Sequence, residues 1–189
     1  MADRSTYTWV HEDGVGVASC ITVVAGIGPD EALRRFGADT SRTFDLEIEA
    51  EDAEAYGWSI AAAAVPGGVV LVEPNGFQGS REEVLLRVAG DGVAASVFWN
   101  VNSDNSFVAV RAGEVVVAVD MYDFLDAGDP EVLQDLDLPA ELLPLCLRAA
   151  ELDEEPWPTG LAMAETFTGV AIPRAAVVEP TTLHPLPQR

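Results

Sequence analysis

The stretch that decides the fold covers residues 69–120 and reads VVLVEPNGFQGSREEVLLRVAGDGVAASVFWNVNSDNSFVAVRAGEVVVAVD. It opens with a β-branched run over 69–73, and a glycine-rich turn and a helical pattern then extend to residue 89. Three more runs rich in β-branched and aromatic residues follow at 93–99, 107–111 and 114–120. Strands joined by such short links pair antiparallel, so we expect these runs to form one antiparallel layer.

The turn at 74–80 and the helix after it carry strong local signals. Asn75 and Gly76 adopt positive φ at low cost, which lets the chain leave the strand there. Ser80 followed by Glu83 predicts a capping box. The turn is interpreted either as a backbone cradle for an anion at a helix N-terminus or as an ordinary strand-to-helix connection. The second interpretation is favoured because Glu82 and Glu83 would repel an anion.

The segments before this stretch add strands and a helix. Residues 17–24 are rich in β-branched side chains and predict a strand, as does the run 58–65, and residues 7–10 predict a short strand. Residues 29–36 predict a helix, with proline in the first turn and two arginines in the last. The alternation that begins at Phe44 predicts a charged edge strand inside the acidic run 45–54.

Taken together, these patterns predict an α+β fold. We expect a mainly antiparallel sheet of five to seven strands, with helices packed on it and a small C-terminal helical segment. One domain over residues 1–170 is expected, sheet-rich over 1–126 and helical over 127–170. Residues 171–189 hold several prolines and predict an extended tail.

The composition is strongly acidic. The chain carries 32 acidic residues against 10 basic ones, for a net charge of −22, and every base is an arginine. Such a surface repels nucleic acids and anionic lipids and attracts basic partners. No apolar run reaches the ~18 residues that span a bilayer, and the N-terminus lacks the apolar region of a signal peptide. We therefore expect a cytoplasmic protein that binds neither nucleic acid nor membrane.

The sequence gives little support for catalysis. The absence of lysine excludes a Walker A loop and a Schiff-base amine, and no cysteine or histidine cluster has zinc spacing. Cys20 and Cys146 lie in apolar runs and are expected to be free buried thiols, and pairing of Cys20 with His11 as a nucleophile is disfavoured. The aspartates of 120–129 suit a surface loop better than a metal site. No catalytic residue, metal or cofactor is predicted.

Two polar loops supply the candidate binding residues. Phe77 stands in the polar turn at 75–80 and is the aromatic residue expected to be exposed to a partner or ligand. The loop at 99–105 adds asparagines, which also suit a hairpin turn. The candidate binding residues are Asn75, Phe77, Gln78, Trp99, Asn100 and Asn102.

Several landmarks together resemble a known family. They are the motif from Glu73 to Leu85, the run 95–102, Phe107 with Gly113, the segments 20–24 and 29–37, and the run 166–170. This combination is similar to DUF6461, an uncharacterised actinobacterial family, over roughly residues 17–178. Phe77 departs from the tryptophan expected there. The resemblance implies a compact domain and brings no activity, cofactor or site residue.

Two functions of different classes follow. The first is a non-catalytic acidic binding protein with a basic protein partner. In its specific form, this hypothesis describes an immunity- or antitoxin-like protein that masks a basic toxin. The alternative is a small-ligand-binding module, or an enzyme that uses carboxylate and asparagine side chains, with its pocket near the loops at 75–80 and 99–105. The acidic surface and the scarcity of histidines favour the first.

Overall fold

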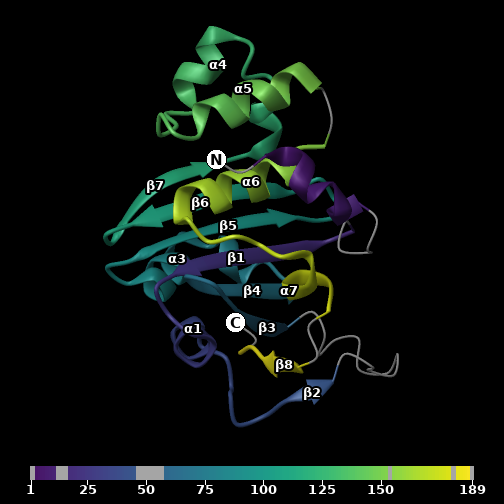
Figure 1. Ribbon diagram of the computed structural model, residues 1–189, viewed down its shortest axis with the longest axis vertical. Helices are drawn as coiled ribbons and strands as arrows, with labels where there is room; N and C mark the ends of the chain where they lie inside the picture. Colours follow the sequence, from purple (N-terminus) through teal and green to yellow (C-terminus); the bar gives the residue numbers. More distant parts are fainter. Residues whose placement is uncertain (1–2, 12–16, 46–57, 153–154, 180–181, 188–189) are drawn as a thin grey trace.

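The computed structural model describes residues 3–11, 17–45, 58–152, 155–179 and 182–187 (Figure 1). These residues form an eight-stranded sheet in the order β2-β8-β3-β4-β1-β5-β6-β7, and every paired strand is antiparallel to its neighbour. The strands are β1 (Ser19–Ala25), β2 (Phe44–Asp45), β3 (Ser59–Val65), β4 (Gly68–Pro74), β5 (Val93–Trp99), β6 (Asn105–Arg111), β7 (Glu114–Val119) and β8 (Thr182–Pro185). The predicted α+β class with a mainly antiparallel sheet is confirmed.

At the centre of the sheet, the connection from β4 to β5 crosses over a third strand, β1, which lies between them. Strand β1 lies between β4 and β5 and pairs antiparallel with both, so β4 and β5 run parallel to each other. The connection between them holds the 3-10 helix η3 (Gln78–Ser80) and helix α3 (Glu82–Ala89). Hairpins join β3 to β4, β5 to β6 and β6 to β7, as their short links predict.

Helices cover both faces of the sheet and bury two apolar cores. One core joins the sheet to η1 (Arg4–His11), α5 (Leu143–Leu152), α6 (Trp157–Thr168) and α7 (Arg174–Val178). The other joins the opposite face to α1 (Pro29–Phe36) and α3. Figure 1 shows α6 in front of the sheet and α3 behind it. The short helices η4 (Met121–Phe124) and α4 (Pro130–Asp135) follow β7.

The structure corrects two local predictions. Residues 7–10 belong to η1 instead of a strand, because Tyr7 and Val10 lie three residues apart and both point into the core. Ser80 does not cap α3: it ends η3, its hydroxyl donates to the Phe77 carbonyl at 2.7 Å, and Arg81 occupies the N-cap position. The capping-box prediction was therefore wrong, although the helix that it predicted is present.

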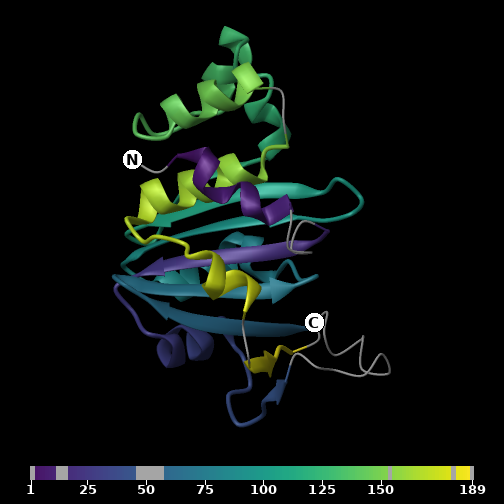
Figure 2. The same cartoon turned by 45° about the vertical axis from the view of Figure 1, so that its right-hand side comes forward.

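The C-terminal segment joins the fold. The expected extended tail forms α7 and then β8, which pairs with both β2 and β3 (Figure 2). Strand β2 begins at Phe44 as predicted, and most of the acidic run 45–54 lies outside the described residues. In the described part of the chain, no helix is both long and apolar enough to cross a membrane.

Candidate functional site

The loop that follows β4 is organised around the side chain of Glu73. This residue lies on the α3 face of the sheet, in line with the buried Val69 and Leu71, and it is only 1% exposed. Its carboxylate accepts a hydrogen bond from the backbone amide of Gln78 at 2.9 Å and from that of Gly79 at 2.7 Å. The backbone cradle in this loop therefore holds a carboxyl group that belongs to the chain itself.

The loop lies so close to Glu73 that only small residues fit at two positions. A Cβ on Gly76 would lie 2.7 Å from the Cβ of Glu73. A Cβ on Gly79 would lie 3.0 Å from the carboxylate and 2.2 Å from the hydroxyl oxygen of Thr22. Asn75, at φ 54°, makes the turn that brings the loop back over the strand. The expectation of positive φ at the start of this turn is confirmed at Asn75.

A buried polar row continues from Glu73 across β1 to β5. The thiol sulfur of Cys20 lies 3.2 Å from the hydroxyl oxygen of Ser96, and the hydroxyl of Thr22 donates to Ser96 at 3.2 Å. Burial raises the pKa of Glu73 to about 7 and outweighs the two amide hydrogen bonds, which lower it. Burial, together with the Glu73 carboxylate, also raises the pKa of the Cys20 thiol.

This chemistry is unsuited to nucleophilic catalysis. A raised pKa keeps the Cys20 thiol protonated, and the thiolate is the reactive form. His11, the partner considered for it, instead places its Nδ1 2.8 Å from the carboxylate of Glu155. Both cysteines are buried and free, as expected. Within the described residues, no group of three or more histidine, cysteine or acidic side chains is arranged to hold a metal ion.

Above the buried row, Phe77 projects from the loop into an aromatic cluster with Trp58 and Phe98. Its ring centroid lies 6.2 Å from that of Trp58 and 6.4 Å from that of Phe98, and both pairs are edge-to-face. Phe77 is 44% exposed, which confirms the exposure predicted for it, and its two neighbours are half-buried. Edge-to-face packing fixes the rings against one another. We call these three residues the aromatic cluster.

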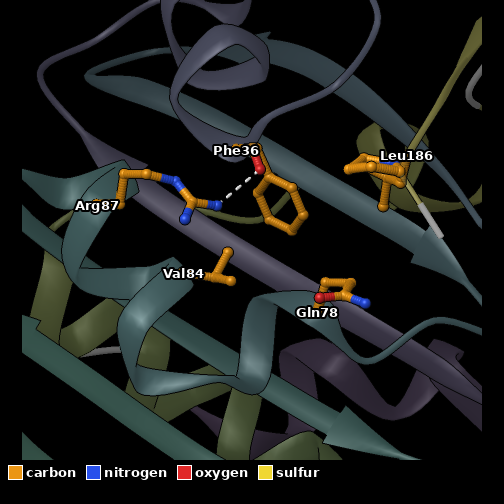
Figure 3. A pocket seen from close by; sticks show the side chains of 6 residues that line it. Phe36, Gln78, Val84, Arg87 and Leu186 are labelled. Carbon is orange, nitrogen blue, oxygen red and sulfur yellow. Dashed lines mark hydrogen bonds between the residues drawn. The ribbon is translucent and has the colours of Figure 1, made fainter. Parts of the chain in front are cut away.

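Gln78 faces a different part of the surface, a shallow pocket between α1, α3 and the end of β8 (Figure 3). Its side chain and those of Phe36, Val84, Arg87, Leu186 and Pro187 line this pocket. The guanidinium of Arg87 donates to the carbonyl of Phe36 at 2.9 Å and so closes the C-terminal end of α1. The side-chain oxygen of Gln78 accepts from Arg81 at 3.2 Å.

The six predicted binding residues do not share one pocket. Trp99 is fully buried on the opposite face, where its ring stacks on Trp157 with centroids 5.8 Å apart. The side-chain oxygen of Asn100 accepts from the amides of Asn102 and Asp104, so the asparagines build the β5–β6 turn. Asn75 and Phe77 are exposed on the loop. Both loops lie at the same end of the sheet, because Ser19 pairs with Pro74 and with Trp99.

Residues 1–181 of the chain match the model of DUF6461, a family of unknown function. The chain belongs to this family. No curated protein and no solved structure matches it. The family resemblance expected from the motif at 73–85 is confirmed, and the match extends closer to both ends of the chain than the landmarks did.

Sequence reasoning missed three residues of the site. The run 69–73 predicts Glu73 only as the end of a strand, yet the alternation of Val69, Leu71 and Glu73 already places its side chain on an apolar face. Trp99 was predicted as a binding residue and Phe98 was not. Neighbouring residues of a strand point to opposite faces, so only one of these two side chains lies on the face of Phe77. Trp58 directly precedes β3, and the short link between β3 and β4 already predicts the hairpin that brings it near the loop of Phe77.

Proposed function

We propose that the protein is a non-catalytic acidic binding protein whose partner is a basic protein. The observation that carries this proposal is an acidic segment from Ala112 to Leu147, which contains no basic residue. It spans β7, η4, α4 and the beginning of α5. All of its acidic side chains are exposed: Glu114, Asp120, Asp123, Asp126, Asp129, Glu131, Asp135, Asp137 and Glu141.

The carboxylates of this segment lie close enough to influence one another. Burial raises the pKa of Asp123, and the neighbouring charges of Asp120 and Asp126 raise it further. Repulsion of this kind is relieved when a cationic surface approaches. A basic partner would therefore gain electrostatic free energy here and would be steered toward the segment during encounter.

Several arginines of the chain are paired within the protein, so their guanidinium groups are not free to meet a partner. Arg34 and Arg35 both pair with Glu31, each at 2.6 Å. Arg87 donates to backbone carbonyls of α1, and Arg111 pairs with Glu141 at 3.3 Å. These contacts support a surface whose available charges are carboxylates.

An immunity- or antitoxin-like role is the specific form of this proposal. A protein that masks a basic toxin benefits from fast capture, which opposite charge provides. The same role suits a cytoplasmic protein, since a toxin made in the cell must be neutralised there. The Cys20 thiol is buried and its raised pKa keeps it protonated. His11 pairs with Glu155 and not with Cys20, so both residues support binding without catalysis.

The proposal is tested by calorimetry at low salt against basic proteins encoded beside the gene. Asp123→Asn with Asp126→Asn removes two charges from the acidic segment without touching a helix cap. Asp30→Asn with Asp91→Asn removes two exposed charges elsewhere and is the matched control. We expect the first double variant to weaken binding more than the second. Absence of detectable binding by the unaltered protein would refute the proposal.

The small-ligand alternative stays a prediction and has its own test. The pocket beside Gln78 is lined by one amide and one guanidinium group, and the N–H groups of Arg87 that do not donate to the carbonyls of Arg35 and Phe36 suit a carboxylate-bearing ligand. Fragment screening by ligand-observed NMR on the whole protein would detect such binding. Arg87→Met should then abolish the signal if Arg87 holds the ligand.

A further inference from the structure

Electrostatic steering brings a partner to a surface, but affinity depends on a few well-packed apolar anchors. In the described part of the chain, the exposed large apolar side chains are Val17, Phe77, Val101, Val116, Tyr122 and Leu147. Among them, Phe77 has aromatic neighbours on two sides, Trp58 and Phe98. Aromatic side chains are enriched among the residues that dominate binding free energy, so Phe77 is the strongest anchor candidate.

The loop that carries Phe77 is held in position before any partner arrives. The Glu73 carboxylate accepts from the amides of Gln78 and Gly79, the two residues that follow Phe77. A second tie runs from the amide of Asn75 to the carbonyl of Ala18 at 3.2 Å. An anchor fixed in advance loses little conformational entropy on binding. Burying a carboxylate to achieve this is costly, which is typical of a loop retained for a purpose other than stability.

The charge of the chain selects the class of occupant for the aromatic cluster. A second copy would also carry a net charge of −22, so self-association through this surface is opposed. The face of an aromatic ring attracts a guanidinium group, and Arg111 already lies 4.3 Å from the ring centroid of Phe167 in this protein. Arg81, the arginine nearest to Phe77 in sequence, is engaged with Glu83 and Gln78.

We propose that the aromatic cluster of Trp58, Phe77 and Phe98 binds an arginine side chain of the basic partner, with the guanidinium group over the exposed ring of Phe77. This inference rests on the proposed function, for which it names the anchor point. The net charge of −22 then attracts the partner to the protein, and the aromatic cluster supplies the directional contact. A neutral side chain is not attracted by the negative face of the ring. Removing the arginine of the partner should therefore weaken binding as much as removing the ring of Phe77.

The experiment is an NMR titration of the whole protein with a blocked pentapeptide that contains two arginines, at about 0.15 M salt, where exposed charges further apart than about 8 Å are screened. A peptide with citrulline in place of arginine has nearly the same shape without the charge. The Trp58 indole N–H reports on the cluster. Phe77→Ala removes the ring, Phe77→Leu keeps an apolar side chain, and Val101→Ala alters an exposed apolar residue of the β5–β6 turn as a control.

We expect the arginine peptide to shift the Trp58 indole signal and the citrulline peptide to leave it unchanged. Both Phe77 variants should weaken peptide binding by about two- to five-fold, the effect of an exposed cation–π contact, while Val101→Ala has no effect. Because Phe77→Leu keeps the loop packed, equal weakening in both variants excludes a folding artefact.

Three other outcomes overturn the inference in distinguishable ways. Unchanged binding by both Phe77 variants, with shifts confined to the acidic segment, overturns the aromatic anchor and leaves the proposed function standing. Binding that Phe77→Leu retains in full shows apolar packing without a cation–π contact and overturns the arginine assignment. Absence of any Trp58 shift with the arginine peptide overturns this inference, while calorimetry with basic proteins decides the proposed function separately.

Discussion

Glu73 and Gly79 face each other at the limit of close packing: the Gly79 amide donates to the Glu73 carboxylate at 2.7 Å, and a Cβ on Gly79 would lie 3.0 Å from the same carboxylate. The hydrogen bond requires the backbone of residue 79 to lie this close to the carboxylate, and only glycine, which has no Cβ, fits there. The loop is therefore shaped by one buried side chain of the preceding strand. Its stability should respond to changes at either residue.

Gly79→Ala should destabilise the protein by about 1–3 kcal/mol, the usual cost of forcing an extra methyl group into a packed interior. The new Cβ would also lie 2.2 Å from the buried hydroxyl oxygen of Thr22 on β1, which donates a hydrogen bond to Ser96. Urea unfolding gives the difference in free energy of unfolding. Gly128→Ala is the control, because nothing lies within 4 Å of a Cβ there. Equal stability of the two variants would contradict the packing argument.

The stability of the protein should fall as the pH rises from about 4.5 to about 7 through the contribution of Glu73. Burial raises its pKa in the folded state to about 7 from an ordinary value of 4.5, so the folded state binds the proton more tightly. Stability from this group is therefore present at pH 4.5 and lost by pH 7. The difference amounts to about 3 kcal/mol, since each tenfold change in proton affinity is worth about 1.4 kcal/mol.

Glu73→Gln isolates this effect. The amide does not ionise, so the free-energy difference between the unaltered protein and the variant should change by about 3 kcal/mol between pH 5 and pH 8. Unfolding by urea at both values measures it. Glu82→Gln, which alters an exposed carboxylate at the beginning of α3, controls for general charge effects. A pH-independent difference for Glu73→Gln would show that the carboxylate is already charged at pH 5.

Tyr7→Phe should cost about 1.5–3 kcal/mol, the range for a hydrogen bond to a charged group. The Tyr7 hydroxyl donates to the carboxylate of Glu165 and ties η1 to α6. Burial, together with the Glu165 carboxylate, raises the pKa of Tyr7, which keeps the hydroxyl a donor. Tyr122→Phe, at an exposed tyrosine that packs on Trp157, is the control. Thermal unfolding would show the loss, and equal midpoints for both variants would contradict it.

Local patterns predict most strands and helices because each depends on its own residues. Helix α1 has proline first and arginines last, and it begins at Pro29 and ends at Phe36 as expected. Strand β5 spans 93–99 as predicted. The position of β1 between β4 and β5 depends on which strands pair, and no local pattern encodes that. The candidate site depends on the same pairing, since β1 between β4 and β5 determines how far the loop of Phe77 lies from Phe98.

The C-terminal segment shows how a non-local contact overrides composition. Its prolines favour an extended tail, and Leu183 is one apolar residue among them. In the structure, Leu183 is fully buried on β8, where it pairs with Phe44 of β2. The partner strand lies far away in the sequence, so the residues around Leu183 do not encode the pairing.

Leu183→Ala should therefore destabilise the whole protein by about 2–5 kcal/mol, as expected for a leucine truncated in a core. A strand that pairs with a neighbour on each side unfolds with the rest of the sheet, so a single cooperative transition should shift to lower urea concentration. Leu147→Ala is the matched control, because Leu147 is 42% exposed on α5 and should change stability by less than about 1 kcal/mol. If Leu183→Ala were as stable as the control, β8 would contribute nothing to the fold in solution.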